Sequence, residues 1–156
     1  MKRESVSITY QVLTAEELTD AQKKLMSSAQ DIVKTAYSPY SKYQVGAAIL
    51  MADGAIIKGN NQENAVYPLG LCAERVALFN MGAQYPDGQP TMMALTVASE
   101  NKPGFPCGSC RQAFVEFEQR YQCKIPLLIE SVNNTFLYFE NGSNLLPFAF
   151  DQSNLG

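Results

Sequence analysis

Residues 45–58 read VGAAILMADGAIIK, two apolar runs on either side of a turn. The uncharged run from Val45 to Met51 predicts a buried strand. Asp53-Gly54 favours the tight turn of a β-hairpin, because these residue types tolerate the positive φ that the turn needs. The returning strand is expected from Ala55 to Lys58. This hairpin predicts a sheet, and the elements on both sides of it decide the fold class.

Two elements are expected before the hairpin. Every second residue from Val6 to Val12 is apolar, which predicts a strand with one buried face. Thr14-x-x-Glu17 matches a capping box, the pair of side chains that satisfies free N–H groups at the start of a helix. The helix expected there carries apolar residues at helical spacing from Leu18 to Ala36, and Pro39 ends it.

Two helices and three strands are expected after the hairpin, beyond a polar loop at residues 59–70. Strands that a helix connects are expected to run parallel, because the crossover returns the chain in the same direction. The order β, α, β-hairpin, α, β, α, β, β predicts an α/β domain with helices on a mixed sheet. The expected elements are helix 72–81, strand 92–98, helix 108–121, strand 125–130 and strand 135–140, the last two joined by a turn at Asn133-Asn134.

Composition narrows the class of protein. The chain has 156 residues, of which 46% are apolar and 17% charged, and this predicts one globular domain. The net charge of −3 argues against tRNA or DNA as a partner, because polyanions bind basic faces. The sequence contains no histidine, which excludes Ser-His-Asp and Cys-His nucleophiles and every metal site that includes histidine.

The N-terminal residues and the apolar runs bear on the compartment. The first twelve residues, MKRESVSITYQV, lack the apolar core of a signal peptide. The longest apolar stretch, QVGAAILMA at 44–52, is far too short to cross a bilayer. We therefore expect no membrane partner and a cytoplasmic location. The four cysteines are then expected to be thiols or metal ligands rather than disulfides.

Three of the cysteines lie in two short motifs, CAER at 72–75 and PCGSCRQ at 106–112, each at the start of an expected helix. A helix N-terminus stabilises a thiolate and so lowers the pKa of the thiol. The two helices follow separate strands, so their N-termini can meet at one end of the sheet. Thiolates from Cys72, Cys107 and Cys110 on one Zn²⁺ would leave the fourth tetrahedral position open, as in catalytic zinc sites.

Charged residues in the same motifs suit such a site. Three thiolates give a zinc site a net charge of −1, and Arg75 and Arg111 are candidates to offset it by donating to sulfur. Glu74 is close to the expected metal and is not needed as a ligand. It could therefore take a proton from a bound water, which ionises near neutral pH on zinc.

The motif Cys-Ala-Glu followed by Pro-Cys-x-x-Cys resembles the signature of the zinc nucleoside and nucleobase deaminases. Cys72 stands where many of them have histidine, so the chain resembles the all-cysteine branch, the small homotetrameric cytidine deaminases. The resemblance implies a single-domain α/β/α sandwich over residues 1–156 with a mixed five-stranded sheet, to which an N-terminal extension at 1–14 adds a strand. Three further segments resemble family elements: YSKYQVGAA (40–48) its first strand, NQENAVY (61–67) its ribose-binding loop and LLPFAF (145–150) its C-terminal segment.

The resemblance also implies the reaction. One zinc ion per subunit would be bound by Cys72, Cys107 and Cys110, and Glu74 would shuttle the proton. The expected activity is hydrolytic deamination of cytidine and 2′-deoxycytidine to uridine and 2′-deoxyuridine plus ammonia, in pyrimidine salvage.

Five residues receive substrate-binding roles from the same resemblance. Asn61 and Glu63 would hydrogen-bond the ribose hydroxyls, and Tyr43 would lie against the nucleoside. Ala73 would contact the pyrimidine ring through its backbone. Phe150 would reach the active site of a neighbouring subunit in the homotetramer.

Other interpretations of these residues stay open. Cys-x-x-Cys also occurs in thioredoxin-like redox proteins, and Cys107-x2-Cys110-x12-Cys123 has nearly the spacing of a structural zinc site. The aromatic residues at 136–150 suit a subunit interface or plain core packing. The competing functions are a deaminase of an aminoacyl-nucleoside antibiotic, a polynucleotide-editing deaminase and a non-enzymatic zinc-binding module.

Overall fold

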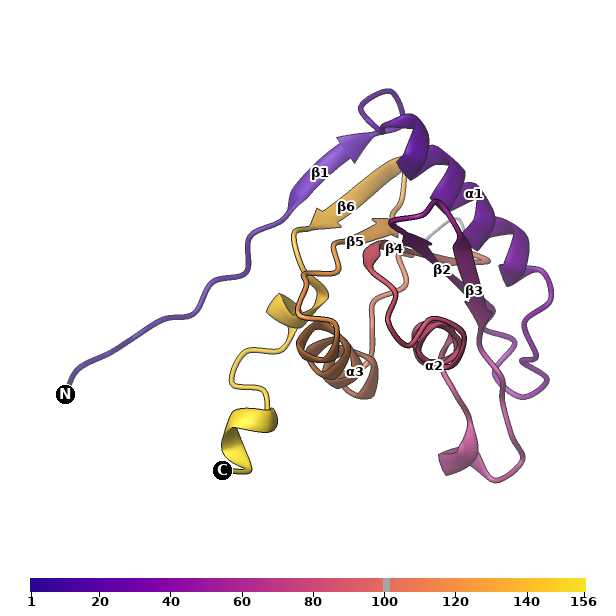
Figure 1. Cartoon of the computed structure of the whole chain (residues 1–156). Coiled ribbons are helices and arrows are strands. Elements are labelled where there is room, and N and C mark those ends of the chain that lie inside the picture. Colours follow the sequence, from indigo (N-terminus) through magenta and orange to yellow (C-terminus); the bar gives the residue numbers. More distant parts are fainter. Residues whose placement is uncertain (100–101) are drawn as a thin grey trace.

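The structure is a computed structural model that describes residues 1–99 and 102–156 (Figure 1). Its three α-helices are α1 (Asp20–Val33), α2 (Ala73–Gln84) and α3 (Gly108–Arg120). Its strands are β1 (Gln11–Thr14), β2 (Val45–Met51), β3 (Ile56–Asn60), β4 (Pro90–Val97), β5 (Leu127–Glu130) and β6 (Thr135–Phe139). Short 3-10 turns occur at Tyr67–Leu69, Gly142–Leu145 and Gln152–Asn154.

The six strands form one mixed sheet in the order β1-β6-β5-β4-β2-β3. β4 and β5, which α3 connects, pair in parallel, and the other neighbouring strands pair antiparallel. Asn133 and Asn134 both adopt positive φ in the turn between β5 and β6. The expected order of elements and the parallel pairing are confirmed, and β1 is the additional N-terminal strand at one edge of the sheet.

Helices cover both faces of this sheet (Figure 1). On one face α1 packs through Leu25 and Ala29 in a cluster that includes Ala48 of β2. On the other face α2 and α3 pack on Ile49 and the residues around it, with Phe114 of α3 fully buried. Alternate residues of β2 therefore serve opposite clusters, and the expected α/β/α sandwich is confirmed.

The prediction of a strand with one buried face at Val6–Val12 is wrong. The strand is β1, which begins at Gln11, and every apolar residue of the predicted alternation is exposed. The reason is the length of β6, the strand that pairs with β1, because β6 ends at Phe139, which lies beside Tyr10 with the two rings 5.4 Å apart. Among the described residues, no strand pairs with the segment before Tyr10, although its sequence alternates.

The predicted start of the first helix is also wrong. Thr14 and Glu17 form a turn, in which Thr14 N donates to the Glu17 carboxylate at 2.8 Å and Glu17 N donates to Thr14 O at 3.2 Å. The helix begins at Asp20, where Thr19 and Gln22 make a second capping box that is complete. Two capping signals follow one another closely, and the helix uses the later one and ends at Val33 rather than Ala36.

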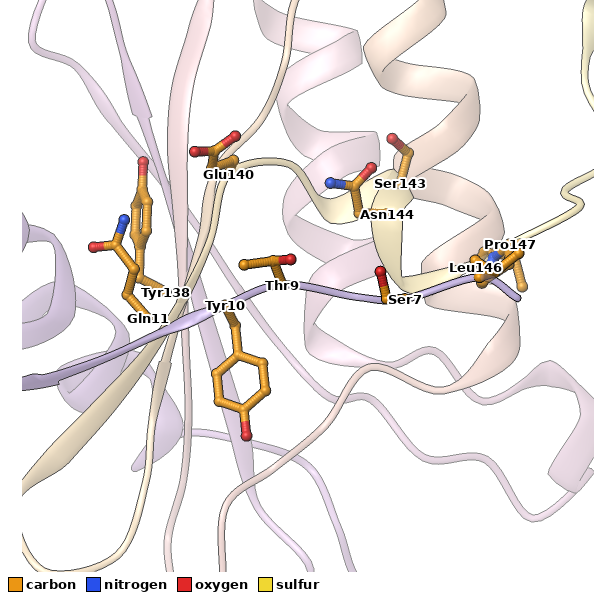
Figure 2. Close-up of a pocket in the computed structure, with 11 residues that line it drawn as sticks. Ser7, Thr9, Tyr10, Gln11, Tyr138, Glu140, Ser143, Asn144, Leu146 and Pro147 are labelled. Carbon is orange, nitrogen blue, oxygen red and sulfur yellow. The ribbon is translucent and has the colours of Figure 1, made fainter. Parts of the chain in front are cut away.

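A hollow of about 570 Å³ lies between the N-terminal segment and the turn after β6 (Figure 2). Figure 2 shows the rings of Tyr10 and Tyr138 pointing in opposite directions, with Glu140 on the β6 side. The residues that line this hollow include one carboxylate and no thiol. Among the described residues, no helix is both long enough and apolar enough to span a bilayer.

Gly59 lets α2 lie directly on the hairpin. A Cβ at this position would lie 2.4 Å from Ala77 N and 2.7 Å from Ala73 O, both backbone atoms of α2. Gly59→Ala is therefore expected to lower the free energy of unfolding by about 1–3 kcal/mol, because the helix must move away from β3. Urea unfolding measures this loss. Gly108→Ala is the matched control, since a Cβ there meets no atom within 4 Å, and equal stability of the two variants would contradict the prediction.

Candidate functional site

The cysteines of the two motifs come together at one end of the sheet. Cys72 is the N-cap of α2 and Cys107 the N-cap of α3, while Cys110 lies in the first turn of α3. The sulfur of Cys107 is 3.7 Å from that of Cys72 and 3.5 Å from that of Cys110, and all three lie within 4.8 Å of one another. Neither N-cap side chain accepts a hydrogen bond from its own helix, so both sulfurs are free to face a shared ligand.

This spacing suits a tetrahedral zinc ion. Zn–S bonds of about 2.3 Å at tetrahedral angles place two ligand sulfurs about 3.8 Å apart. The observed separations of 3.7 and 3.5 Å are close to that value. Thiolate sulfur also favours zinc over magnesium or calcium. Geometry and donor type therefore both fit zinc, with a fourth position left for another ligand.

The thiols of Cys72 and Cys110 have pKa values shifted in opposite directions, because they share a hydrogen bond. The pKa of Cys72 is lowered to about 5, first by its hydrogen bond with the Cys110 thiol and further by Cys107 and Arg75. The pKa of Cys110 is raised, because the same contact holds its proton against the Cys72 thiolate and because the side chain is buried. A divalent cation would stabilise both thiolates and displace the remaining proton, so the cluster is ready to exchange protons for a metal.

Glu74 places a carboxyl group beside the thiols. It is the second residue of α2 and only 3% exposed. Burial raises the pKa of this carboxyl to about 7, and the negative charge of Cys72 adds to the rise. A carboxyl with such a pKa can take up and release a proton near neutral pH, as general acid–base catalysis requires.

Arg75 acts on the thiols through its charge. Its guanidinium is one of the groups that lower the pKa of the Cys72 thiol. Its Nη2 donates to Gly70 O at 3.2 Å, and its Nε is buried without a hydrogen-bond partner among the described residues. The side chain therefore keeps one donor free beside the cysteine cluster.

Arg111 has different surroundings from those expected. Its Nε donates to Pro106 O at 2.9 Å and its Nη1 donates to Leu145 O at 3.0 Å. Both donors reach carbonyl oxygens instead of the thiolate sulfur expected from the sequence, and an effect of the Arg111 charge on the thiolates stays a prediction. The physical reason is that the C-terminal tail returns along α3 and offers an acceptor there. Arg111 thus ties the segment before Cys107 to the tail.

A cavity of about 540 Å³ opens beside the thiols. Its volume is that of a small-molecule site. Part of its wall comes from the segment before β2 and part from the loop after β3, and the two motifs supply its floor. The residues singled out in the sequence that line it are Tyr43, Asn61, Glu63, Cys72, Glu74 and Cys107.

Asn61 is fixed in this wall by both ends of its carboxamide. Its Oδ1 accepts from Val45 N at 2.8 Å, and its Nδ2 donates to Tyr43 O at 2.8 Å. The side chain of Tyr43 lines the cavity, and burial raises the pKa of its phenol, with the charge of Glu74 adding to the rise. Asn61 therefore connects the loop after β3 to the segment that carries Tyr43.

Five residues assigned from the sequence do not line this cavity, and two of them are Arg75 and Arg111. Ala73 and Cys110 are fully buried. Phe150 is 60% exposed, and its carbonyl oxygen accepts a hydrogen bond from Gln112 Nε2 at 2.7 Å, on α3. Phe150 does not reach the cavity of its own chain, so a role at a neighbouring site stays a prediction, as does the backbone contact of Ala73.

The wall also contains residues that the sequence did not single out. Phe105 stands directly before Pro106-Cys107, and this position was the signal that could have identified it. Gly104 allows the loop to approach β4, since a Cβ there would lie 2.2 Å from Val97 Cγ1. The remaining lining residues are Ser41, Val45, Gln62, Tyr67, Gly70, Leu71, Leu95 and Val97.

Cys123 lies apart from the other cysteines. It is partly buried against the core, and its sulfur donates weakly to Pro90 O at 3.8 Å. The thiol cluster consists of Cys72, Cys107 and Cys110. A structural zinc site of four cysteines is therefore not formed, and Cys123 serves as a small core residue.

Comparison with known proteins agrees with this geometry. Residues 19–124 match the model of the family described as the cytidine and deoxycytidylate deaminase zinc-binding region. A cytidine deaminase of Sporosarcina psychrophila is 36% identical over 134 residues, which cover 85% of this chain and 93% of the relative. One from Halalkalibacterium halodurans is 47% identical over 93 residues, 59% of this chain and 68% of the relative.

Solved structures of cytidine deaminases share this fold. The crystal structure of a cytidine deaminase from Burkholderia pseudomallei superposes with a TM-score of 0.71 at 33% sequence identity, and covers 85% of this chain and all of that one. The family match spans both cysteine motifs and most of the cavity wall. The chain therefore belongs to the zinc-binding cytidine and deoxycytidylate deaminase family of enzymes.

Proposed function

We propose that this enzyme deaminates the free nucleosides cytidine and 2′-deoxycytidine to uridine and 2′-deoxyuridine, with release of ammonia. The observation that carries the proposal is the placement of three thiols at zinc spacing beside a buried carboxyl. That group lies in the wall of a cavity of small-molecule size, together with Asn61 and Glu63. Zinc-dependent cytidine deamination is the activity that this family and this cluster support.

Each residue of the site has a defined task in this reaction. Cys72, Cys107 and Cys110 would hold one zinc ion per subunit, which would lower the pKa of a bound water to near neutral pH. Glu74 accepts the proton of the water that attacks C4 of the cytosine ring, and delivers it to N3. It then takes the proton of the hydroxyl group now on C4 and passes it to the amino group, which leaves as ammonia while C4 becomes a carbonyl.

The part of the cavity wall that carries Asn61 and Glu63 can form hydrogen bonds with one hydroxyl group of the sugar. Asn61 has one N–H left after its contact with Tyr43 O. Glu63 Oε2 already accepts from two backbone amides and Oε1 from the Ser41 hydroxyl, which leaves Oε1 one free lone pair. One sugar hydroxyl can accept from Asn61 and donate to Glu63. We assign it as the 3′-hydroxyl, which cytidine and 2′-deoxycytidine share.

This assignment predicts a pattern of specificity. The kcat/KM for 2′-deoxycytidine is expected to stay within about tenfold of that for cytidine, because the 2′-hydroxyl has no committed partner. For 3′-deoxycytidine it is expected to fall at least about a hundredfold, because the buried Asn61 amide and the half-buried Glu63 carboxylate both lose their ligand. Steady-state kinetics on the three nucleosides measure this. Equal loss with both deoxy compounds would contradict the assignment.

The activity itself is tested by the ultraviolet absorbance of cytidine after addition of purified, metal-replete protein. A steady change toward the uridine spectrum is expected. A flat trace from protein with bound zinc would reject the cytidine assignment. Aminoacyl-nucleoside antibiotics and single-stranded polynucleotides would then be the next substrates, and failure with all of them would favour a non-enzymatic zinc module.

We further propose that the enzyme is a homotetramer in which neighbouring subunits complete each active site. Phe148 and Phe150 support this, because large apolar side chains in the C-terminal tail are exposed in the single chain. The expected role is pyrimidine salvage in the cytoplasm, where thiol ligands stay reduced. Light scattering coupled to gel filtration measures the mass, and an active monomer would reject the shared site.

A further inference from the structure

Two segments that are far apart in the sequence are joined beside the cavity. Tyr37 N donates to Asn61 O at 3.0 Å, and Glu63 N donates to Tyr37 O at 2.8 Å. Residues 38–42 then make one turn closed by a hydrogen bond of 3.1 Å from Lys42 N to Ser38 O. The turn lies next to the loop that carries Asn61 and Glu63, so its free N–H groups can face that loop.

Those groups hold the Glu63 carboxylate from one side. Tyr40 N and Ser41 N donate to Glu63 Oε2 at 2.9 and 3.3 Å. The Ser41 hydroxyl donates to Glu63 Oε1. That hydroxyl is itself oriented, because its oxygen accepts from Tyr43 N at 3.0 Å, and a hydroxyl has only one proton to donate. Its proton is therefore committed to Glu63.

We propose that Ser41 is a positioning residue for substrate binding, whose hydroxyl fixes Glu63 with one oxygen lone pair open to the sugar. The inference rests on the proposed role of Glu63 as the partner of a sugar hydroxyl. Ser41 also lines the cavity beside Glu63, so the two groups share the same wall. Preorganised acceptors bind more tightly because little side-chain freedom is lost when the ligand arrives.

The charge of Glu63 depends on the same contact. The hydrogen bond from Ser41 is the largest cause that lowers the pKa of Glu63, and desolvation opposes it. The amide of Tyr40 and the positive charge of Lys42 lower this pKa further. The phenols of Tyr40 and Tyr67 line the hollow next to this carboxylate. The titratable side chains of Tyr43, Cys72, Glu74 and Cys107 line the cavity together with it. Because only the ionised carboxylate accepts two hydroxyl protons, sugar binding is expected to persist at pH values below the usual titration range of glutamate.

The test compares Ser41→Ala with Ser41→Thr. Ser41→Ala is expected to raise the KM for cytidine about three- to tenfold with kcat changed less than twofold, because ground-state binding is lost and the chemistry is not touched. The affinity for the product uridine, measured by calorimetry, is expected to fall by the same factor. Ser41→Thr retains the hydroxyl and is expected to restore both. Ser28→Ala, which removes a hydroxyl that donates within α1, is the matched control.

Two further measurements separate positioning from a general loosening of the loop. The pKa of the Glu63 carboxyl, followed by carbon-13 NMR, is expected to rise in Ser41→Ala, so that uridine affinity declines at a higher pH than in the unmodified enzyme. In a Glu63→Ala background, Ser41→Ala is expected to change the KM less than twofold, since the partner is gone.

Unchanged KM and uridine affinity in Ser41→Ala would overturn the inference. The inference would also be overturned if Ser41→Ala lowered both the kcat and the midpoint temperature of unfolding and Ser41→Thr restored neither. That pattern indicates a structural role alone. An unmodified enzyme that does not turn over cytidine would instead reject the proposed function. The NMR titration and uridine binding would still decide the role of Ser41.

Discussion

Replacing Glu74 by Gln is expected to lower kcat for cytidine by about three orders of magnitude while zinc stays bound. Gln keeps the size of the side chain but cannot accept the proton of the attacking water or return it to the ring. The cysteine sulfurs remain, so the metal content measured by atomic emission is expected to stay equal to that of the unmodified enzyme. Continuous absorbance assays measure the turnover of cytidine by the unmodified enzyme, and long fixed-time assays measure the much slower turnover by the variant.

Measuring the pH dependence of stability separates a loss of catalysis from a loss of folding. Burial raises the pKa of Glu74 to about 7 in the folded metal-free chain, above its usual value of 4.5. Its ionisation therefore costs stability as the pH rises from about 4.5 to 7, and Glu74→Gln removes that cost. The variant is expected to unfold no earlier than the parent at pH 8. Glu116→Gln, an exposed change on α3, is the control, and substantial turnover by Glu74→Gln would reject the proton-shuttle role.

Cys107→Ala is expected to abolish stable zinc binding and with it measurable deamination. Replacement of a partner outside the ligand shell already costs about 10–100-fold in metal affinity, so the loss of one of three ligands is expected to cost more. Cys107 is the exposed member of the cluster, so its removal leaves no cavity in the core. Zinc content after dialysis and the cytidine assay measure the two effects together.

Cys123→Ala is the matched control for that change. Its sulfur takes no part in the cluster, and the variant is expected to keep zinc and full activity. Zinc retention by Cys107→Ala, or zinc loss by Cys123→Ala, would contradict the three-thiol site. Removal of zinc from the unmodified enzyme by a chelator is expected to reproduce the inactivity of Cys107→Ala, and added zinc is expected to reverse it only in the unmodified enzyme.

Local signals in the sequence were sufficient for the chemistry of the site. Cys72 and Cys107 each precede a helical pattern, and the structure makes both of them N-caps. The hairpin at 45–60 and the turn at Asn133-Asn134 follow from residue types that tolerate the required φ. These features depend on residues close together in the sequence, which is why they can be predicted from one sequence.

Features that depend on a distant partner were not predicted. The alternation at Val6–Val12 is a genuine strand pattern, but its paired length is set by β6, more than a hundred residues later. The same holds for Arg111, whose acceptors include Leu145 O, and for Phe105, which enters the cavity wall through the path of a loop. Nothing near these residues in the sequence specifies which group they meet.

The two N-cap cysteines lie 35 residues apart and enclose the whole of β4 between them. A metal bound to both acts as a cross-link, and closure of a loop of this length reduces the entropy of the unfolded chain by an amount worth roughly 4 kcal/mol. In the folded chain β3 and β4 lie on either side of β2, and the segment between the two cysteines contains β4. Bound zinc is therefore expected to slow the release of this strand, so that the ion required for the reaction also holds the sheet together.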